Sequence, residues 1–197
     1  MSIALFSLNT SAQTSITNPT STNLLNEKDL TGWTIYGTEK WSVKKDVLLA
    51  TNGPDQEFGY LGTDNNYKNF ELNLEFKQGT SNSNGGVFVH STIEGTKIKG
   101  WQVEIGAQGH FTGGIHAYDR GWLIKPELEK DKALKVGKWN HLKILLKGDK
   151  MVVWLNGTEM SSLTDPKLAK AEGIIALQIH KGDDTKLEWR NIKITEL

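Results

Sequence analysis

Residues 70–77 read Phe-Glu-Leu-Asn-Leu-Glu-Phe-Lys, with apolar and polar side chains alternating at every position. Successive side chains of a β-strand point to opposite faces of its sheet, so this period of two predicts a strand with one buried face. Residues 141–147 and 175–180 alternate in the same way, apart from the additional apolar Leu145. Asn156-Gly157 is typical of a tight turn between two such strands. The chain therefore reads as a succession of short antiparallel strands.

Helical patterns are confined to two short segments, residues 126–134 and 165–171. The strand patterns follow one another at near-regular spacing, with neither an internal repeat nor the alternation of strands and helices typical of parallel sheets. We therefore predict an all-β fold, a two-sheet antiparallel β-sandwich of the jelly-roll type with a concave face for a ligand. The last run changes phase near Asn191, which indicates a β-bulge.

The composition narrows the classes of protein and partner. The chain has 197 residues, enough to bury a sizeable core, and no Cys, which excludes disulfides and thiolate metal sites. Lys plus Arg and Asp plus Glu each number 23, and this balance argues against nucleic acid or an anionic membrane as the main partner. No apolar run approaches the ~20 residues that span a bilayer, so we expect no membrane span. The oligomeric state stays open.

The N-terminus has the features of an incomplete export signal. Residues 3–8 form a short apolar run, and residues 9–13 form a small-residue segment that resembles a signal-peptidase site. A basic region ahead of the apolar run is missing, so a disordered leader is the alternative. We predict that residues 1–21 are a leader and linker, that residues 22–197 form a single β-sandwich domain, and that the protein is exported to the periplasm or the extracellular space.

Residues 100–123, GWQVEIGAQGHFTGGIHAYDRGWL, are rich in groups that a packed core does not accommodate. Two Trp residues and several amide, carboxylate, imidazole and guanidinium groups surround a flexible Gly-Gly pair, and most of these groups need hydrogen-bond partners when buried. A sugar ring packs its C–H face on an aromatic side chain, while polar side chains bind its hydroxyls. We therefore predict that this segment forms the floor and rim of a groove for a saccharide partner.

Strand parity predicts which polar groups share that groove. Gln102 and Glu104 oppose the apolar residues of their run, and Gln178 and His180 do the same near the end of the chain. His90 likewise falls opposite the Val residues of its own run. We expect one carboxylate, two amides and two imidazoles to converge in a single groove.

Several ordered segments resemble the 3-keto-disaccharide hydrolase domain family. Residues 24–33, Leu-Leu-Asn-Glu-Lys-Asp-Leu-Thr-Gly-Trp, are similar to its opening motif LFxGxxLxGW. Further similar segments follow in order at residues 41–43, 46–48, 69–72, 75–76, 84–89, 100–105, 112–115, 121–123, 139–140, 154–157, 173–180 and 189–194. Each piece alone is weak, but the ordered set covers almost the whole predicted domain and is specific.

This resemblance implies a concanavalin A-like lectin/glucanase sandwich, often exported in bacteria. It also implies an activity on sugars, usually on glycosides whose 3-hydroxyl has been oxidised to a ketone. Many members have Glu-x-Gln where this chain has Gln102-Val103-Glu104, which exchanges the positions of the carboxylate and the amide. Residues 116–120 also differ from the Tyr-Asp-led segment of the family, so the family's substrate choice at this loop is not carried over.

A ketone at C3 makes the proton at C2 acidic, and the glycosidic oxygen at C1 then leaves by β-elimination, followed by addition of water. This route needs a general base, an electrophile for the enolate and an acid for the departing oxygen. Glu104 is the candidate base, because burial in a partly dry groove raises a carboxylate pKa. The other candidate catalytic residues are His90, Asp119 and Arg120. The candidate substrate-binding residues are Gln102, His116, Tyr118, Trp122, Gln178 and His180.

Most of these residues also have a structural interpretation. The alternative interpretation of Glu104 is a solvent-facing strand residue, and that of His90 and His180 is a hydrogen-bonded structural histidine. The alternative interpretation of Asp119-Arg120 is an ion pair that orders its loop. Five Trp residues are expected to pack in the core or on the sheets, namely those at positions 33, 41, 139, 154 and 189.

Two further functions stay open, non-catalytic carbohydrate binding and conventional hydrolysis of unoxidised glycans. Residues 71–75, Glu-Leu-Asn-Leu-Glu, resemble the catalytic strand of sandwich glucanases, but the central Asn breaks that motif. The two Glu residues would lie roughly 13 Å apart on a strand, too far for the ~5 Å spacing of retaining catalysis. We predict no cofactor, with a divalent metal such as Ca²⁺ as the alternative electrophile and Asp183-Asp184 as minor candidates for binding it.

Overall fold

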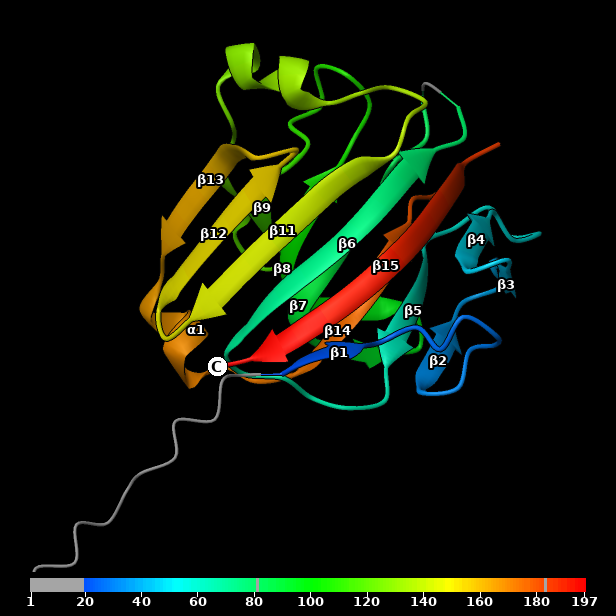
Figure 1. Ribbon diagram of the computed structural model, residues 1–197, viewed down its shortest axis with the longest axis horizontal. Helices are drawn as coiled ribbons and strands as arrows, with labels where there is room; N and C mark the ends of the chain where they lie inside the picture. Colours follow the sequence, from blue (N-terminus) through cyan, green and yellow to red (C-terminus); the bar gives the residue numbers. More distant parts are fainter. Residues whose placement is uncertain (1–19, 81, 183) are drawn as a thin grey trace, which may run out of the picture.

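The computed structural model describes residues 20–80, 82–182 and 184–197, which form two antiparallel β-sheets packed face to face (Figure 1). Residues 1–19 of the predicted leader lie outside the described residues. The first strand begins at Ser21, one residue before the predicted start of the domain. In the part of the chain that the structure describes, no helix is long and apolar enough to cross a membrane.

The first sheet has eight strands. They are β1 (Ser21–Asn23), β3 (Lys40–Lys44), β4 (Val47–Thr51), β6 (Phe70–Gln78), β11 (Asn140–Lys147), β12 (Lys150–Leu155), β13 (Thr158–Thr164) and β15 (Lys186–Glu196). Their order is β13-β12-β11-β6-β15-β4-β3, and β1 pairs with one end of β15. The alternating run at residues 70–77 is thus a central strand of this sheet.

The second sheet has seven strands and lies behind the first in Figure 1. They are β2 (Trp33–Tyr36), β5 (Gly59–Thr63), β7 (Gly85–Glu94), β8 (Lys97–Ile105), β9 (Ile115–Ala117), β10 (Gly121–Ile124) and β14 (Ile174–Ile179). Their order is β10-β9-β8-β7-β14-β5-β2. The predicted all-β, two-sheet antiparallel sandwich is confirmed.

The core lies between the sheets and follows the predicted strand parity. Strand β6 buries its four apolar side chains, those of Phe70, Leu72, Leu74 and Phe76, while the residues between them are only half-buried. From the facing sheet, Val103 and Ile105 of β8 and Leu177 of β14 are fully buried in the same cluster. Burial of these alternating apolar faces is the main stabilising contribution to the sandwich.

Short helices and bulges interrupt the strands at few places. A 3₁₀ helix, η1 (Leu128–Ala133), and a short helix, α1 (Pro166–Lys170), occupy the two segments with helical patterns. The predicted bulge in β15 is confirmed, since its pairing with β6 shifts register between Arg190 and Lys193. A second bulge, between Val89 and Thr92 of β7, has no counterpart in the sequence pattern.

Candidate functional site

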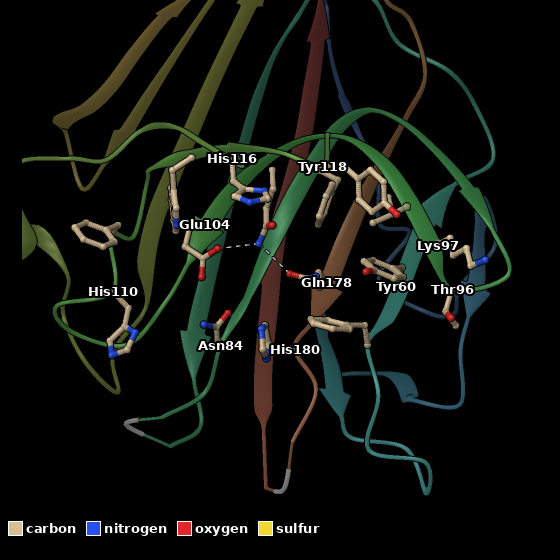
Figure 2. A pocket seen from close by; sticks show the side chains of 16 residues that line it. Tyr60, Asn84, Thr96, Lys97, Glu104, His110, His116, Tyr118, Gln178 and His180 are labelled. Carbon is tan, nitrogen blue, oxygen red and sulfur yellow. Dashed lines mark hydrogen bonds between the residues drawn. The ribbon is translucent and has the colours of Figure 1, made fainter. Parts of the chain in front are cut away.

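The outer face of the seven-stranded sheet carries a groove of about 590 Å³. This volume lies within the range of sites that enclose small organic ligands. Strands β5, β7, β8, β9, β10 and β14 and the loops beside them supply its lining. The lining residues are Phe58, Tyr60, Asn84, Phe88, Thr96, Lys97, Ile98, Gln102, Glu104, His110, Phe111, His116, Tyr118, Trp122, Gln178 and His180. Figure 2 shows these side chains meeting over the sheet.

A row of hydrogen-bonded polar side chains crosses the middle of the groove. The Gln102 amide nitrogen donates to Glu104 Oε2 at 2.8 Å and to Gln178 Oε1 at 3.0 Å. Figure 2 shows His116 on one side of this row and Asn84 and His180 on the other. Because Gln102 uses the Gln178 carbonyl oxygen, the Gln178 amide nitrogen remains a donor. The hydrogen bond from Gln102 therefore fixes the position of the Glu104 carboxyl group.

Burial governs the charge of the groups in this groove. Glu104 is only 8% exposed, and burial raises its pKa to about 7, with a hydrogen bond from Asn84 acting in the opposite direction. Burial also lowers the pKa of His116, which favours a neutral imidazole at pH 7. A carboxyl group that titrates near neutral pH can take a proton from carbon and release it again.

The remaining walls consist of aromatic rings and further imidazoles. Trp122 is 38% exposed, and its ring lies 5.6 Å from that of His116 and 5.5 Å from that of Phe111. A partly exposed indole beside hydrogen-bonding groups is a suitable platform for a sugar ring. His180 Nδ1 lies 3.1 Å from the carbonyl oxygen of Lys181, and because a carbonyl oxygen only accepts, Nδ1 is the donor of this hydrogen bond.

A family model described as the 3-keto-alpha-glucoside-1,2-lyase-like domain matches residues 20–195. The chain belongs to this family. It is the family that the ordered sequence motifs resemble, so that prediction is confirmed. No curated protein matches the chain.

Solved structures similar to this member of the lyase-like family include proteins assigned as glycosyl hydrolases. One, from Parabacteroides distasonis ATCC 8503, is 26% identical with a TM-score of 0.70, and the match covers 90% of this chain and 100% of that one. A second from the same organism is 20% identical with a TM-score of 0.67, covering 90% and 94%. The carbohydrate binding module CBM66 from Bacillus subtilis is 16% identical with a TM-score of 0.62, covering 85% and 96%. For the second Parabacteroides protein and for CBM66, at 20% and 16% identity, the similarity shows the fold alone.

All six predicted substrate-binding residues line the groove, and so does Glu104. His90 does not, and the parity argument that placed it there is wrong. His90 lies in the β7 bulge with a φ of 48°, which turns its ring toward the core instead of the outer face. There its Nε2 lies 2.8 Å from the carbonyl oxygen of Lys68, and its ring contacts Phe70 and Trp101 edge-on. These contacts support the structural interpretation of His90, which also lines a separate cavity of about 400 Å³ with Trp101, Asp119 and Arg120.

Asp119 and Arg120 also lie outside the groove, so their predicted catalytic placement is corrected. Arg120 Nη2 donates to Asp165 Oδ2 at 2.6 Å, and Asp165 in turn caps the N-terminus of α1. Asp119 is largely exposed and lies 3.5 Å from Arg120 and 3.6 Å from Lys167. Although burial acts to raise the pKa of Asp165, the Arg120 guanidinium contributes to holding it below its usual value. These groups connect the β9–β10 turn to α1.

Sequence reasoning missed several groove residues. Asn84 and His110 lie in loops at strand ends, where no periodicity assigns a direction to a side chain. Tyr60 lies in β5, whose five residues are all buried, so its strand has no polar face to mark the groove. The predicted core packing is confirmed for Trp33, Trp41 and Trp189, which are buried in the core.

The described residues contain no group of three or more His, Cys, Asp or Glu side chains able to hold a metal ion. Of the two minor Ca²⁺ candidates, position 183 lies outside the described residues. The groove itself presents one carboxylate beside imidazoles and amides. The prediction of no cofactor stays a prediction.

Gly86 provides the space that the polar row needs. A Cβ atom at this position would lie 2.7 Å from Gln102 Nε2 and 3.0 Å from the Val103 carbonyl oxygen. Gly86→Ala is therefore expected to displace Gln102 and to destabilise the protein by about 1–3 kcal/mol, the usual cost of overpacking. Urea unfolding measures this loss of stability.

A double-mutant cycle controls for indirect effects of Gly86→Ala. In a Gln102→Ala background the clash with the Gln102 side chain is absent and only the 3.0 Å contact with the Val103 carbonyl oxygen remains, so adding Gly86→Ala should destabilise the protein less than it does in the parent. Losses of stability that simply add would contradict this interpretation of Gly86.

Proposed function

We propose that this protein cleaves glycosides carrying a ketone at C3, and that Glu104 is the general base. The observation that carries the proposal is a buried carboxyl group with a pKa of about 7 at the floor of a groove suited to a sugar. Glu104 is also the only carboxylate among the described residues that line the groove. A module that only binds sugars needs aromatic rings and amides but no titrating base.

The first step is removal of the C2 proton by the Glu104 carboxylate. Its charged form is disfavoured by burial, so it regains stability when it takes up a proton. The negative charge that develops on the C3 oxygen needs donors close by. The amide nitrogen of Gln178 and the ring N–H of His116 are the candidates, since Gln178 ends the row that holds Glu104 and His116 lies beside that row (Figure 2).

The second step breaks the bond between C1 and the glycosidic oxygen. The electron pair of the enolate forms the C1–C2 double bond as the glycosidic oxygen departs with the former bonding pair. Addition of water across that double bond would complete hydrolysis. The description of the family as lyase-like supports an elimination as the central step.

Incubation with trehalose and with 3-keto-trehalose tests the proposal. We expect release of glucose from the keto sugar alone. Cleavage of both sugars would instead support a conventional glycosidase. Binding of the keto sugar by calorimetry, without turnover, would support the carbohydrate-binding alternative, which the sandwich fold and the aromatic walls also suit.

The pKa of Glu104 predicts the pH dependence of the reaction. The base must be ionised, so kcat/KM for 3-keto-trehalose should rise about 10-fold per pH unit below pH 7 and level off above it. A pH–rate profile between pH 5 and 9 measures this. A profile that is flat through pH 6–8 would remove Glu104 from the role of base.

We also propose that residues 1–21 direct export, as the apolar run and the small-residue segment suggest. Expression in a bacterial host, followed by fractionation and determination of the N-terminal sequence, tests this. A periplasmic product that begins within residues 10–21 is expected. Full-length protein confined to the cytoplasm would contradict export.

A further inference from the structure

The groove has two chemically different ends. Figure 2 shows Glu104, His110 and His116 toward one end, and Tyr60, Tyr118, Thr96 and Lys97 toward the other, with Gln178 between them. We call these the Glu104 end and the aromatic end. The aromatic end comprises Phe58, Tyr60, Phe88, Thr96, Lys97, Ile98 and Tyr118.

The aromatic end is a preformed apolar surface. Tyr60 and Phe88 pack edge to face with ring centroids 5.8 Å apart, and Ile98 belongs to the same buried cluster. Phe58 stands at its border, with its ring 4.6 Å from that of His180. Tyr118 is 55% exposed, which leaves its ring available to a ligand.

Hydrogen-bonding capacity is unequal between the two ends. The aromatic end has no carboxylate and no amide among its residues, and its polar atoms are hydroxyls and the Lys97 ammonium group. Several hydroxyls of a second sugar ring would be left unpaired there, and each buried unpaired polar group costs about 1–3 kcal/mol. An aromatic group has no such requirement and packs favourably on aromatic side chains.

The two ends also differ in groups that could donate a proton to the departing oxygen. No carboxylic acid lies at the aromatic end to protonate a departing oxygen, and burial lowers the pKa of His116, which disfavours its protonated form at pH 7. A phenol ionises with a pKa of about 10, as Tyr does, while water has a value of about 16 and sugar hydroxyls lie nearer to water. A phenolate can therefore depart without an acid.

We propose that the departing group of the substrate is an aromatic alcohol, bound at the aromatic end while the keto sugar lies over Glu104 and against Trp122. Glu104 takes the C2 proton, the C1–C2 double bond forms, and the C1–O bond breaks with its electron pair leaving on the phenolate oxygen. The phenolate then takes a proton from water. The products are a phenol and a 1,2-unsaturated 3-keto sugar, with no change in total oxidation state. This inference rests on the proposed function.

Competing substrates test the inference. The 3-keto derivatives of phenyl α-glucoside and trehalose share the reacting ring and differ in the departing group. We expect kcat/KM to be at least about 10-fold higher for the phenyl derivative, as for other ligands matched to an apolar pocket. Equal or faster cleavage of 3-keto-trehalose would overturn the inference and leave the proposed function standing. Failure to cleave either substrate would overturn both.

Variants separate recognition from the intrinsic reactivity of a phenolate. Tyr118→Ala and Phe58→Ala should each lower kcat/KM for the phenyl derivative about 3- to 10-fold more than kcat/KM for 3-keto-trehalose, the worth of an aromatic contact. Trp154→Ala, on the far face of the opposite sheet, is the control and should change neither. Equal losses on both substrates in the Tyr118 and Phe58 variants would overturn the inference.

Discussion

Replacing Glu104 with Gln is expected to lower kcat/KM for 3-keto-trehalose by about 10²- to 10⁴-fold, the contribution of a positioned general base. The substitution keeps the shape of the side chain, and its carbonyl oxygen can still accept the hydrogen bond from Gln102. Loss of turnover would therefore report loss of the base and not of the groove. Steady-state kinetics at pH 8, where the carboxylate is ionised, gives the largest difference.

The same variant should be more stable than the parent protein at pH 8. The folded protein raises the pKa of Glu104 from 4.5 to about 7, so the folded state holds a proton that the unfolded state has lost between these pH values. Stability from this group is therefore lost as the pH rises through that window. At about 1.4 kcal/mol per pH unit, the ionised carboxylate costs the fold about 3 kcal/mol at pH 8. Gln avoids this cost, so urea unfolding should show a gain at pH 8 that disappears near pH 4.

Glu75→Gln is the matched control for both measurements. Glu75 lies on the far face of the eight-stranded sheet, where it accepts a 2.8 Å hydrogen bond from Arg190 Nε and has a lowered pKa, with the Arg190 hydrogen bond as the first cause. Its replacement should leave kcat/KM unchanged and slightly destabilise the protein at pH 8. Turnover retained in Glu104→Gln, or lost equally in Glu75→Gln, would contradict the assignment of the base.

Regular strand parity explains which parts of the groove could be predicted from the sequence. Gln102, Glu104 and Gln178 lie on strands whose apolar faces are unambiguous, and each one points where the alternation predicts. Their convergence follows from the sheet order, in which β7 separates β8 from β14. That order is a long-range property, and the pattern of any single strand does not contain it.

His90 illustrates the limit of the same argument. A one-residue bulge reverses the face of every side chain beyond it, and the bulge in β7 depends on a positive φ at a His, a residue with no strong preference for that conformation. Arg120 illustrates a second limit, because its partner Asp165 lies 45 residues away. Neither the bulge nor this long-range ion pair produces a local pattern in the sequence.

Trp189→Ala is expected to destabilise the protein by about 3–5 kcal/mol, the usual cost of deleting a buried aromatic side chain. Trp189 is fully buried between the sheets and packs against Phe76, with ring centroids 6.3 Å apart. The cavity left behind removes contacts from both sheets, so the melting temperature should fall by about 10 °C or more in a domain of this size. Calorimetry measures the loss, and one cooperative transition is expected if residues 22–197 unfold as a single domain.

Trp154→Ala provides the matched control for this core substitution, since the same residue type lies on the outer face of the same sheet. Trp154 is half-buried, and Lys143 Nζ lies 4.2 Å from its ring centroid, a contact worth about 1 kcal/mol. Its loss should therefore cost far less than that of Trp189. The two Trp residues differ mainly in which face of the sheet they occupy. Similar losses of stability for both variants would therefore contradict the assignment of inner and outer faces. The placement of the groove depends on that assignment.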